Sequence, residues 1–322
     1  MGSFAAWRLS FALNASHSAE QHKLTVFGHY QPRLRQINQH GINLISLDKR
    51  RTCFNVLATS DIPRLPEIDI ALVFNKTYQL DRVAGEVHRS VKQHGLVICF
   101  QNGMGSDRLV REANPDKKIA AGVLFEGVTL DQAGDILHKG SGSTWLSLSP
   151  QTEAMYASIL SLLRLGGFDL RVQSDISSMQ WAKLAANAAI NPLTALTGAK
   201  NKQVAEHPLL RNIASAVAAE ITRVAELEQI RRDSEYLEHI LYVAMRTGEN
   251  TSSMLTDIRQ GRETEVQHIN GAIVKLGRKH KIQTPVNQML TELVADYRNS
   301  PISLEILENH WQRLISNHTT QQ

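Results

Sequence analysis

Cysteine is scarce in this chain: Cys53 and Cys99 are the two thiols among 322 residues. A disulfide-rich secreted domain needs far more, and so low a content fits a reducing compartment. No apolar run approaches the roughly 18 to 20 residues that span a bilayer, and the first residues lack the basic-then-apolar layout of a signal peptide. We therefore expect a cytoplasmic protein that does not enter a membrane.

Motifs for metal binding and for nucleophilic catalysis are also absent. The sequence contains no CxxC pair, no HExxH, no GxSxG and no complete Walker A loop, and its 13 histidines are scattered. The formal net charge is +4, from 35 Lys and Arg against 31 Asp and Glu, and the basic clusters at 48–51 and 278–281 are short. Neither a metal site nor a nucleic-acid partner is expected.

The first half of the chain alternates short apolar runs with amphipathic stretches, a pattern typical of a parallel sheet covered by helices. We expect strands at 23–30, 68–74, 95–103, 118–125, 135–140, 143–149 and 169–175. Helices are expected at 31–40 and 77–94, each closing on a His-Gly pair that would cap it. The pattern predicts an α/β domain that extends to residue 175.

The second half, from residue 176 to 322, has long helical patterns and almost no strand signal. The clearest helices are expected at 251–260, 264–279 and 284–296. Thr264 and Gln267 have the spacing of a capping box at the start of the second of these. The sequence therefore predicts an all-helical second domain.

Polar residues recur every four positions in the apolar segment WAKLAANAAINPLTAL (181–196), where they are Lys183, Asn187 and Asn191. A helix would place them in one narrow stripe. Burying an amide without a partner costs roughly 1–3 kcal/mol and an ammonium costs more, so a buried stripe needs something polar facing it. A bound oxygen-rich ligand would supply that partner. The alternative is a stripe that faces solvent on an ordinary alanine-rich helix.

Other candidate residues stand at the ends of predicted strands and the starts of predicted helices. Asn102 and Lys76 each follow an apolar strand, whose carboxyl end would face the ligand crevice of a doubly wound sheet. A plain Asn-Gly turn and a solvated loop are the alternatives. Glu265 falls in a predicted first helical turn, where the helix dipole favours a carboxylate, and Ser253 offers a hydroxyl that could simply start a helix.

Taken together, these segments resemble the ketopantoate reductase (2-dehydropantoate 2-reductase) family over nearly the whole chain. The resemblance rests on KTYQ (76–79), QNGMGS (101–106), the run from Lys183 to Leu196, SSMLTDIRQGRETE (252–265), ING (269–271) and GRKHKIQTPVN (277–287). It implies a Rossmann-like NADP-binding domain at 1–175 that lacks its first strand, followed by a helical substrate domain at 176–322. It also implies an NADPH-dependent oxidoreductase that converts 2-dehydropantoate to (R)-pantoate for coenzyme A synthesis, with its active site in the cleft between the domains.

The resemblance assigns roles position by position. Lys183 matches the general acid that protonates the ketone oxygen as hydride arrives, and such proton donors typically contribute about 10²–10⁴-fold. Asn102 matches the amide that lies between cofactor and substrate. The remaining substrate-holding positions correspond to Asn187, Asn191, Asn201 and Ser253, and the cofactor-side positions to Gly2, Lys76, Gln79, Gly127 and Glu265.

One departure from the family concerns the start of the chain. The family begins with a strand and a G-x-G-x-x-G turn, whereas this chain begins MGSFAAWRLSFAL, and only Gly2 can match the last glycine. The two other glycines make the tight turn and let the backbone approach the pyrophosphate. We expect Met1 to be an assigned start inside the motif, with about ten further residues upstream, enough for a strand and a turn. The alternative is a real loss of both.

Several points stay open at this stage. The protein could instead reduce a related branched 2-oxo acid, or be a non-catalytic relic that has lost its cofactor. NADPH rather than NADH is inherited from the resemblance, because no Arg or Lys stands at the end of the 23–30 strand, although Arg33 or Arg35 could reach a 2′-phosphate. The expected partner is a small-molecule 2-oxo acid. A homodimer is compatible with apolar positions such as Leu237 and Ile240, although a core role is favoured for them.

Overall fold

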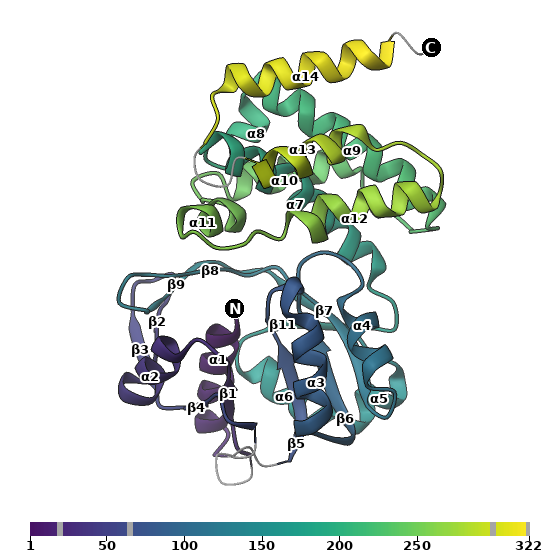
Figure 1. Cartoon of the computed structure of the whole chain (residues 1–322). Helices are drawn as coiled ribbons and strands as arrows, with labels where there is room; N and C mark the ends of the chain where they lie inside the picture. The colour runs from purple at the N-terminus through teal and green to yellow at the C-terminus, as the bar shows by residue number, and fades with distance from the viewer. Residues whose placement is uncertain (18–21, 63–66, 297–300, 320–322) are drawn as a thin grey trace. The chain divides into compact units, whose positions relative to one another are not determined.

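The computed structural model describes residues 1–17, 22–62, 67–296 and 301–319 (Figure 1). The chain divides into two compact units. The first comprises Met1–Gln101 and Gly105–Ile176, and the second comprises Asn102–Met104 and Ser177–Gln322. The short loop that carries Asn102 therefore belongs to the unit of the C-terminal helices, although a strand of the first unit precedes it.

The first unit contains helices and strands in alternation. Its helices are α1 (Gly2–Ala15), α2 (Gln31–His40), the 3-10 helix η2 (Thr77–Gln79), α3 (Leu80–Ser90), α4 (Ser106–Ala113), α5 (Pro150–Met155) and α6 (Ala157–Leu165). Its strands are β1 (Thr25–Phe27), β2 (Ile42–Ile45), β3 (Arg51–Phe54), β4 (Leu57–Thr59), β5 (Ile68–Val73), β6 (Val91–Cys99), β7 (Lys118–Leu124), β8 (Gly127–Leu130), β9 (Ile136–Gly140), β10 (Ser143–Ser147) and β11 (Asp169–Gln173). They form a five-stranded sheet in the order β11-β10-β7-β6-β5, a four-stranded sheet in the order β3-β2-β9-β8, and the pair β1-β4.

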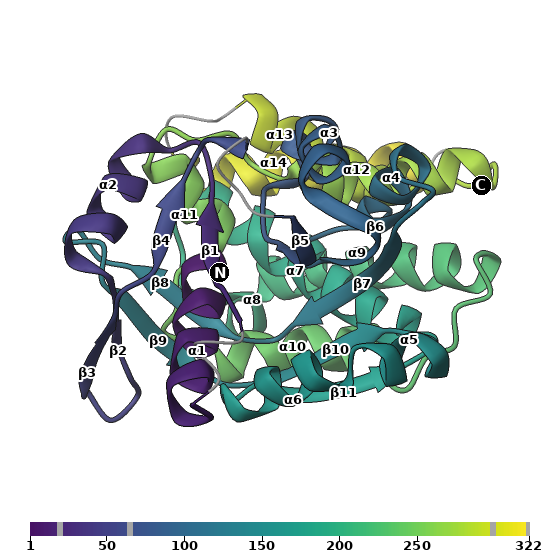
Figure 2. The ribbon, with the colours of Figure 1, turned by 90° about the horizontal axis from the view of Figure 1, so that it is seen from below.

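Side chains of the five-stranded sheet alternate between two buried faces. In β6, Leu96 and Ile98 pack with residues of α1 and α6, whereas Val97 and Cys99 pack with residues of α3 and α4. Figure 2 shows helices on both sides of these strands. Burial on both faces explains why the segment LVICF is a continuous apolar run, and burial raises the pKa of the Cys99 thiol to about 12. The predicted α/β layering is confirmed.

The sheet lacks a strand at its centre in the part of the chain that the structure describes. β1 pairs in parallel with β4, and β5 ends the five-stranded sheet (Figure 2). In a doubly wound sheet of order 3-2-1-4-5-6, β1 and β5 correspond to strands two and four, which lie on either side of strand one. The first described element is instead α1, and a Cβ at Gly2 would lie 3.7 Å from the ring of Phe74, just after β5. The unit is thus Rossmann-like without its first strand, as predicted.

Of the two predicted His-Gly helix caps, one ends a helix and the other lies in a strand. Gly41, with φ at 70°, ends α2 as predicted. The helix predicted to run to His94 instead ends at Ser90, and that prediction was wrong. The pair His94-Gly95 lies inside β6, where His94 has a φ of 62° and a Cβ at Gly95 would lie 3.1 Å from the backbone oxygen of Asp69. The pair therefore accommodates the shift in register between β5 and β6.

In its described part, the second unit is helical. It contains α7 (Ser177–Thr197), α8 (Gln203–Glu206), α9 (Pro208–Leu227), α10 (Tyr236–Arg246), α11 (Ser253–Arg259), α12 (Val266–Lys279), α13 (Pro285–Asp296) and α14 (Leu304–Thr319). The all-helical prediction is confirmed, and the helices expected at 251–260, 264–279 and 284–296 correspond to α11, α12 and α13. The predicted capping box at Thr264 is wrong, because Glu265 occupies the N-cap position of α12.

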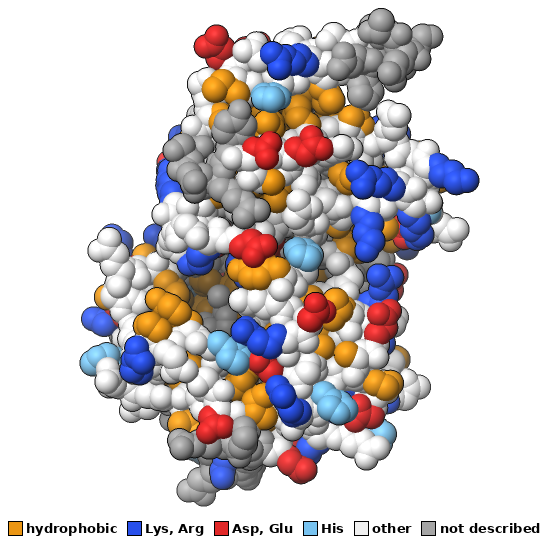
Figure 3. Space-filling model, viewed as in Figure 1, with side chains coloured by type: hydrophobic (Ala, Val, Ile, Leu, Met, Phe, Trp, Pro, Cys, Tyr) orange, Lys and Arg blue, Asp and Glu red, His pale blue; other side chains and the backbone are white. Residues whose placement is uncertain are grey.

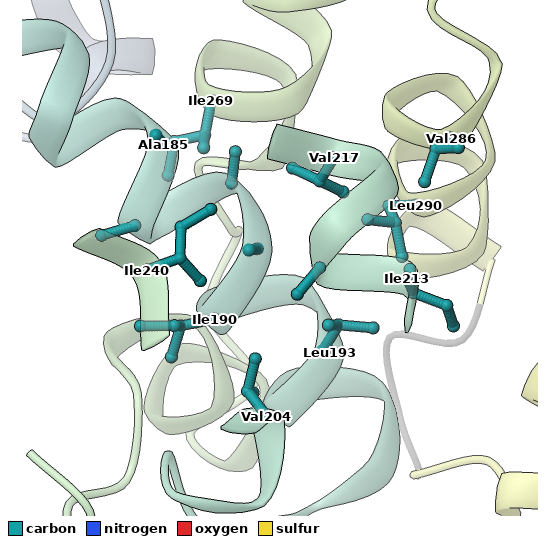
Figure 4. Packing of buried hydrophobic residues seen from close by; sticks show 14 of the residues in the cluster. Ala185, Ile190, Leu193, Val204, Ile213, Val217, Ile240, Ile269, Val286 and Leu290 are labelled. Carbon is teal, nitrogen blue, oxygen red and sulfur yellow. The ribbon is translucent and has the colours of Figure 1, made fainter. Parts of the chain in front are cut away.

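Helix α7 is the centre of this unit and contacts α9, α10, α11, α12 and α13. Ala185, Ile190 and Leu193 project from α7 into a cluster that includes Val217 of α9 and Leu290 of α13 (Figure 4). The many alanines of α7 keep its surface small, so several helices can pack closely around it. This packing fixes the helix that carries the polar stripe.

The surface and helix lengths give two further findings. On the face drawn in Figure 3, Lys and Arg side chains lie among Asp and Glu side chains rather than in one basic field. Among the described residues, no helix is both long and apolar enough to cross a membrane.

Candidate active site

The predicted stripe lies on α7. Lys183 and Asn187 are partly buried and Asn191 is 6% exposed, while most of their neighbours on this helix are buried and apolar. A stripe facing solvent, the alternative considered from sequence, would leave all three side chains exposed. The three groups therefore lie along one side of α7, where a polar ligand could contact them.

The electrostatics of Lys183 suit proton transfer. Burial lowers the pKa of its ammonium group to about 8, and the charge of Glu265 acts in the opposite direction by raising it. An amine with a pKa close to the working pH can hold a proton and also release it readily. The two residues, 82 positions apart in the sequence, form one electrostatic pair.

Asn102 contacts the carboxylate of Glu265 as well. Glu265 is 4% exposed, and Asn102 Nδ2 donates a hydrogen bond to its Oε2 at 3.1 Å. The neighbouring Gly103 has a φ of 86°, and a Cβ there would collide with the backbone oxygen of His268 on α12. Glycine is required for this close approach of the loop to the helix. The structure thus joins Lys183, Glu265 and Asn102, which are three of the predicted site residues.

Asn201 is a buried amide with one free end. Its Nδ2 donates to Thr247 Oγ1 at 2.9 Å, whereas its Oδ1 is buried without a hydrogen-bond partner in the described structure. Leaving a buried acceptor unpaired costs about 1–3 kcal/mol, so this oxygen is suited to accept a hydrogen bond from a ligand.

Ser253 is exposed as the first residue of α11, and the neighbouring Ser252 caps that helix. Ser252 Oγ accepts a hydrogen bond from the Leu255 N–H at 3.2 Å and another from Thr194 Oγ1 of α7 at 2.7 Å. Sequence reasoning missed this link between α7 and α11. The doubled serine before the helix was its one available signal.

The predicted cofactor-side residues of the first unit lie at the ends of elements. Gly2 begins α1, Lys76 precedes η2 and Gly127 begins β8. Gln79, the last residue of η2, accepts a hydrogen bond from Asn75 Nδ2 at 3.3 Å. A Cβ at Gly127 would lie 3.3 Å from the backbone nitrogen of Gly140, so a larger residue would crowd the strand pair β8-β9.

The amino end of α1 is suited to an anion. The positive charges of Lys76 and Arg33 both act electrostatically at Met1, the residue that precedes α1. Arg33 Nη1 donates to Gln36 Oε1 at 2.7 Å, but its Nε and Nη2 are buried without a partner in the described structure. Cations and unpaired donors beside a helix amino end fit a phosphorylated dinucleotide. Arg35, the other arginine considered from sequence, is exposed.

The chain matches the models of a known protein family over most of its length. Residues 1–151 match the model described as ketopantoate reductase PanE/ApbA, and residues 175–298 match ketopantoate reductase PanE/ApbA C terminal. The 2-dehydropantoate 2-reductase of Archaeoglobus fulgidus is 34% identical over 229 residues, which cover 71% of this chain and 76% of that protein. That of Halobacterium salinarum is 28% identical over 272 residues, covering 84% and 89%.

Solved structures share the fold. A PanE/ApbA family ketopantoate reductase from Ralstonia eutropha JMP134 has a TM-score of 0.81 at 22% identity, covering 91% of this chain and 94% of that one. D-mandelate dehydrogenase with NADH and anilino(oxo)acetate also has a TM-score of 0.81 at 22% identity, covering 90% and 94%. The order of elements, the family models and the relatives agree: this chain belongs to the ketopantoate reductase family and is an oxidoreductase.

Proposed function

We propose that this protein reduces 2-dehydropantoate to (R)-pantoate with NADPH. The observation that carries the proposal is the group formed by Lys183, Glu265 and Asn102, in which a partly buried ammonium with a lowered pKa is supported by a buried, hydrogen-bonded carboxylate. On the same helix as this ammonium, Asn187 and Asn191 supply amides. A substrate that carries a carboxylate, a ketone oxygen and a hydroxyl matches this set of donors and acceptors.

The proton step follows from the pKa of Lys183. Bound NADPH supplies the hydride, and negative charge develops on the ketone oxygen as the carbonyl is reduced. Lys183 Nζ donates its proton to that oxygen. With a pKa of about 8, the ammonium form predominates at neutral pH, and the charge of Glu265 helps to maintain it. Asn102 holds the Glu265 carboxylate through its hydrogen bond.

Binding of the acid is assigned to the amides and hydroxyls of the second unit. Asn187 and Asn191 would hold the oxygens of the keto acid, and the unpaired Oδ1 of Asn201 would accept the proton of its hydroxyl. Ser253, exposed at the start of α11, offers a further hydroxyl.

Cofactor binding is assigned to the first unit. Lys76 and the amino end of α1 would hold the pyrophosphate, and Gln79 and Gly127 would lie against the rest of the cofactor. The Nε and Nη2 groups of Arg33, which have no hydrogen-bond partner among the described residues, support a 2′-phosphate and therefore NADPH rather than NADH. The D-mandelate dehydrogenase structures that share this fold contain NADH, so the preference needs its own measurement.

The test compares two acids in the presence of NADPH. One is 2-dehydropantoate, and the other is 3,3-dimethyl-2-oxobutanoate, the same acid without its hydroxyl. We expect kcat/KM to be at least about tenfold higher for 2-dehydropantoate, because the analogue leaves Asn201 Oδ1 unpaired, and the product should be the (R) enantiomer. Equal values would instead favour a reductase of another branched 2-oxo acid. Turnover of neither acid with either cofactor would favour the non-catalytic alternative.

A further inference from the structure

A proline interrupts the helix that carries the polar stripe. Pro192 lies inside α7 and has no N–H, so the carbonyl oxygen of Ala188, four residues earlier, loses its usual helical donor. Ala188 is fully buried, and water cannot replace that donor. The side chain of Asn270 on α12 takes its place, because Asn270 Nδ2 donates to Ala188 O at 2.8 Å.

Asn270 is itself held by a buried chain of hydrogen bonds. Its Nδ2 also donates to Asn287 Oδ1 at 3.0 Å, and Asn287 Nδ2 donates to Glu220 Oε2 at 2.7 Å. Glu220 further accepts from the backbone N–H groups of Val286 at 2.7 Å and of Asn287 at 2.9 Å. Asn270 and Asn287 are 0% exposed and Glu220 is 3% exposed.

The carboxylate of Glu220 fixes which groups donate and which accept in this series of hydrogen bonds. Both carboxylate oxygens of Glu220 accept hydrogen bonds from N–H groups, so Asn287 presents its amide nitrogen, and not its oxygen, to α9. The oxygen of Asn287 is then left for Asn270, and the amide of Asn270 must donate. Its second hydrogen goes to the Ala188 carbonyl. This series of hydrogen bonds therefore places the Asn270 amide as a donor at the Ala188 carbonyl, where Pro192 has removed the backbone donor.

This bond joins the two helices that carry the candidate site. Ala188 directly follows Asn187 and stands between Lys183 and Asn191, while Asn270 lies in the second turn after Glu265. Beside this bond, Ile269 of α12 lies against Ala185 of α7 in the same apolar cluster (Figure 4). This hydrogen bond therefore links α7 directly to α12.

We propose that Asn270 is a positioning residue, which holds α7 against α12 so that Lys183 keeps its electrostatic pairing with Glu265 and the asparagine stripe keeps its register. The proposal rests on the proposed role of Lys183 as proton donor. Asn270 acts through the Ala188 carbonyl and is not assigned a contact with substrate or cofactor.

The test is a double-mutant cycle between Asn270→Ala and Pro192→Ala. Pro192→Ala returns a backbone N–H that can bond to Ala188 O, so the side chain of Asn270 becomes redundant there. With Pro192 present, Asn270→Ala should lower kcat for 2-dehydropantoate by about tenfold or more and move the alkaline limb of the pH profile to lower pH. In the Pro192→Ala background, Asn270→Ala should lower kcat markedly less and should shift the alkaline limb of the pH profile less.

Two further variants separate positioning from general stability. Thr291→Val removes the buried hydrogen bond from Thr291 Oγ1 to Asn287 O, at 2.7 Å on α13, and should lower the unfolding midpoint without moving the limb. Asn270→Ser, which keeps a polar group that is too short for both oxygens, replaces Asn270→Ala if the alanine variant does not fold.

The outcomes are distinct. Equal losses from Asn270→Ala in both backgrounds, or an unmoved limb in every variant, would overturn the positioning role while leaving the reductase function in place. A wild-type protein that does not reduce 2-dehydropantoate would overturn the proposed function, and the positioning role with it.

Discussion

Asn102 Nδ2 donates a hydrogen bond to Glu265 Oε2 over a sequence separation of 163 residues, at 3.1 Å. Glu265 in turn raises the pKa of Lys183 against the larger, lowering effect of burial. One side chain from the 102–104 loop is thereby connected, through a carboxylate, to the candidate proton donor. Changes at Asn102 or at Glu265 should therefore alter the pH at which Lys183 loses its proton.

Reduction should slow on the alkaline side of neutrality. The protonated form of Lys183 is the active form in the proposed step, and burial lowers its pKa to about 8. As pH rises through that value, the fraction of ammonium falls and kcat should fall with it. Steady-state rates measured from about pH 6 to about pH 10 test this. A kcat that stays level throughout that range would contradict it.

Glu265→Gln should move this alkaline limb to lower pH. Glu265 raises the pKa of Lys183, and a neutral amide removes that effect while keeping the shape of the side chain. The limb is read from the same pH profile. Glu263→Gln is the matched control, because Glu263 is exposed two residues earlier and its substitution should leave the limb in place. A limb that moves to higher pH in Glu265→Gln would refute the electrostatic pairing.

Arg33→Ala should weaken NADPH binding and spare NADH. Within the described part of the chain, Nε and Nη2 of Arg33 have no hydrogen-bond partner and are suited to a 2′-phosphate. Loss of such charged hydrogen bonds should raise the Kd for NADPH by about tenfold or more. Fluorescence titration with both cofactors measures the ratio. The exposed Arg35 supplies the control, since Arg35→Ala should leave both values near wild type. Equal weakening of NADH and NADPH by Arg33→Ala would show a general rather than a 2′-phosphate role.

Arg8→Met should destabilise the first unit. Arg8, 7% exposed on α1, pairs with Glu126 at 3.1 Å, and Glu126 also pairs with His138 at 2.8 Å. Removing the arginine takes the guanidinium away from this buried carboxylate and leaves it the His138 imidazole, at a cost of about 3–5 kcal/mol. Urea unfolding gives the difference.

The control for Arg8→Met is an exposed pair of the same kind. Arg171 pairs with Asp169 at 3.4 Å, with side chains 56% and 59% exposed. Arg171→Met should cost less than about 1 kcal/mol. Similar losses from the two substitutions would contradict the argument from burial.

Local periodicity made much of the fold and part of the site predictable. The four-residue spacing of Lys183, Asn187 and Asn191 predicted one helix face, and α7 carries all three. The run of apolar residues in β6 predicted a strand buried on both sides. In both cases the signal is contained in a short window, which is where side-chain periodicity is informative.

Features that depend on distant partners were not predictable in this way. His94-Gly95 has the same composition as the His-Gly pair that ends α2, but pairing with β5 makes it part of a strand. The hairpin of β2 and β3 was missed because each strand has four residues, too few for a clear period. Asn270 was visible as part of ING, yet its contact with Ala188 lies 82 residues away.

The central claim, that Lys183 supplies the proton in a reduction of 2-dehydropantoate, is tested most directly by Lys183→Ala. Turnover of NADPH with 2-dehydropantoate should fall by about 10²–10⁴-fold, as for other positioned proton donors, in a protein that keeps its fold by circular dichroism. Lys275→Ala, at an exposed position of α12, should turn over like wild type. An unchanged kcat in folded Lys183→Ala would contradict the account.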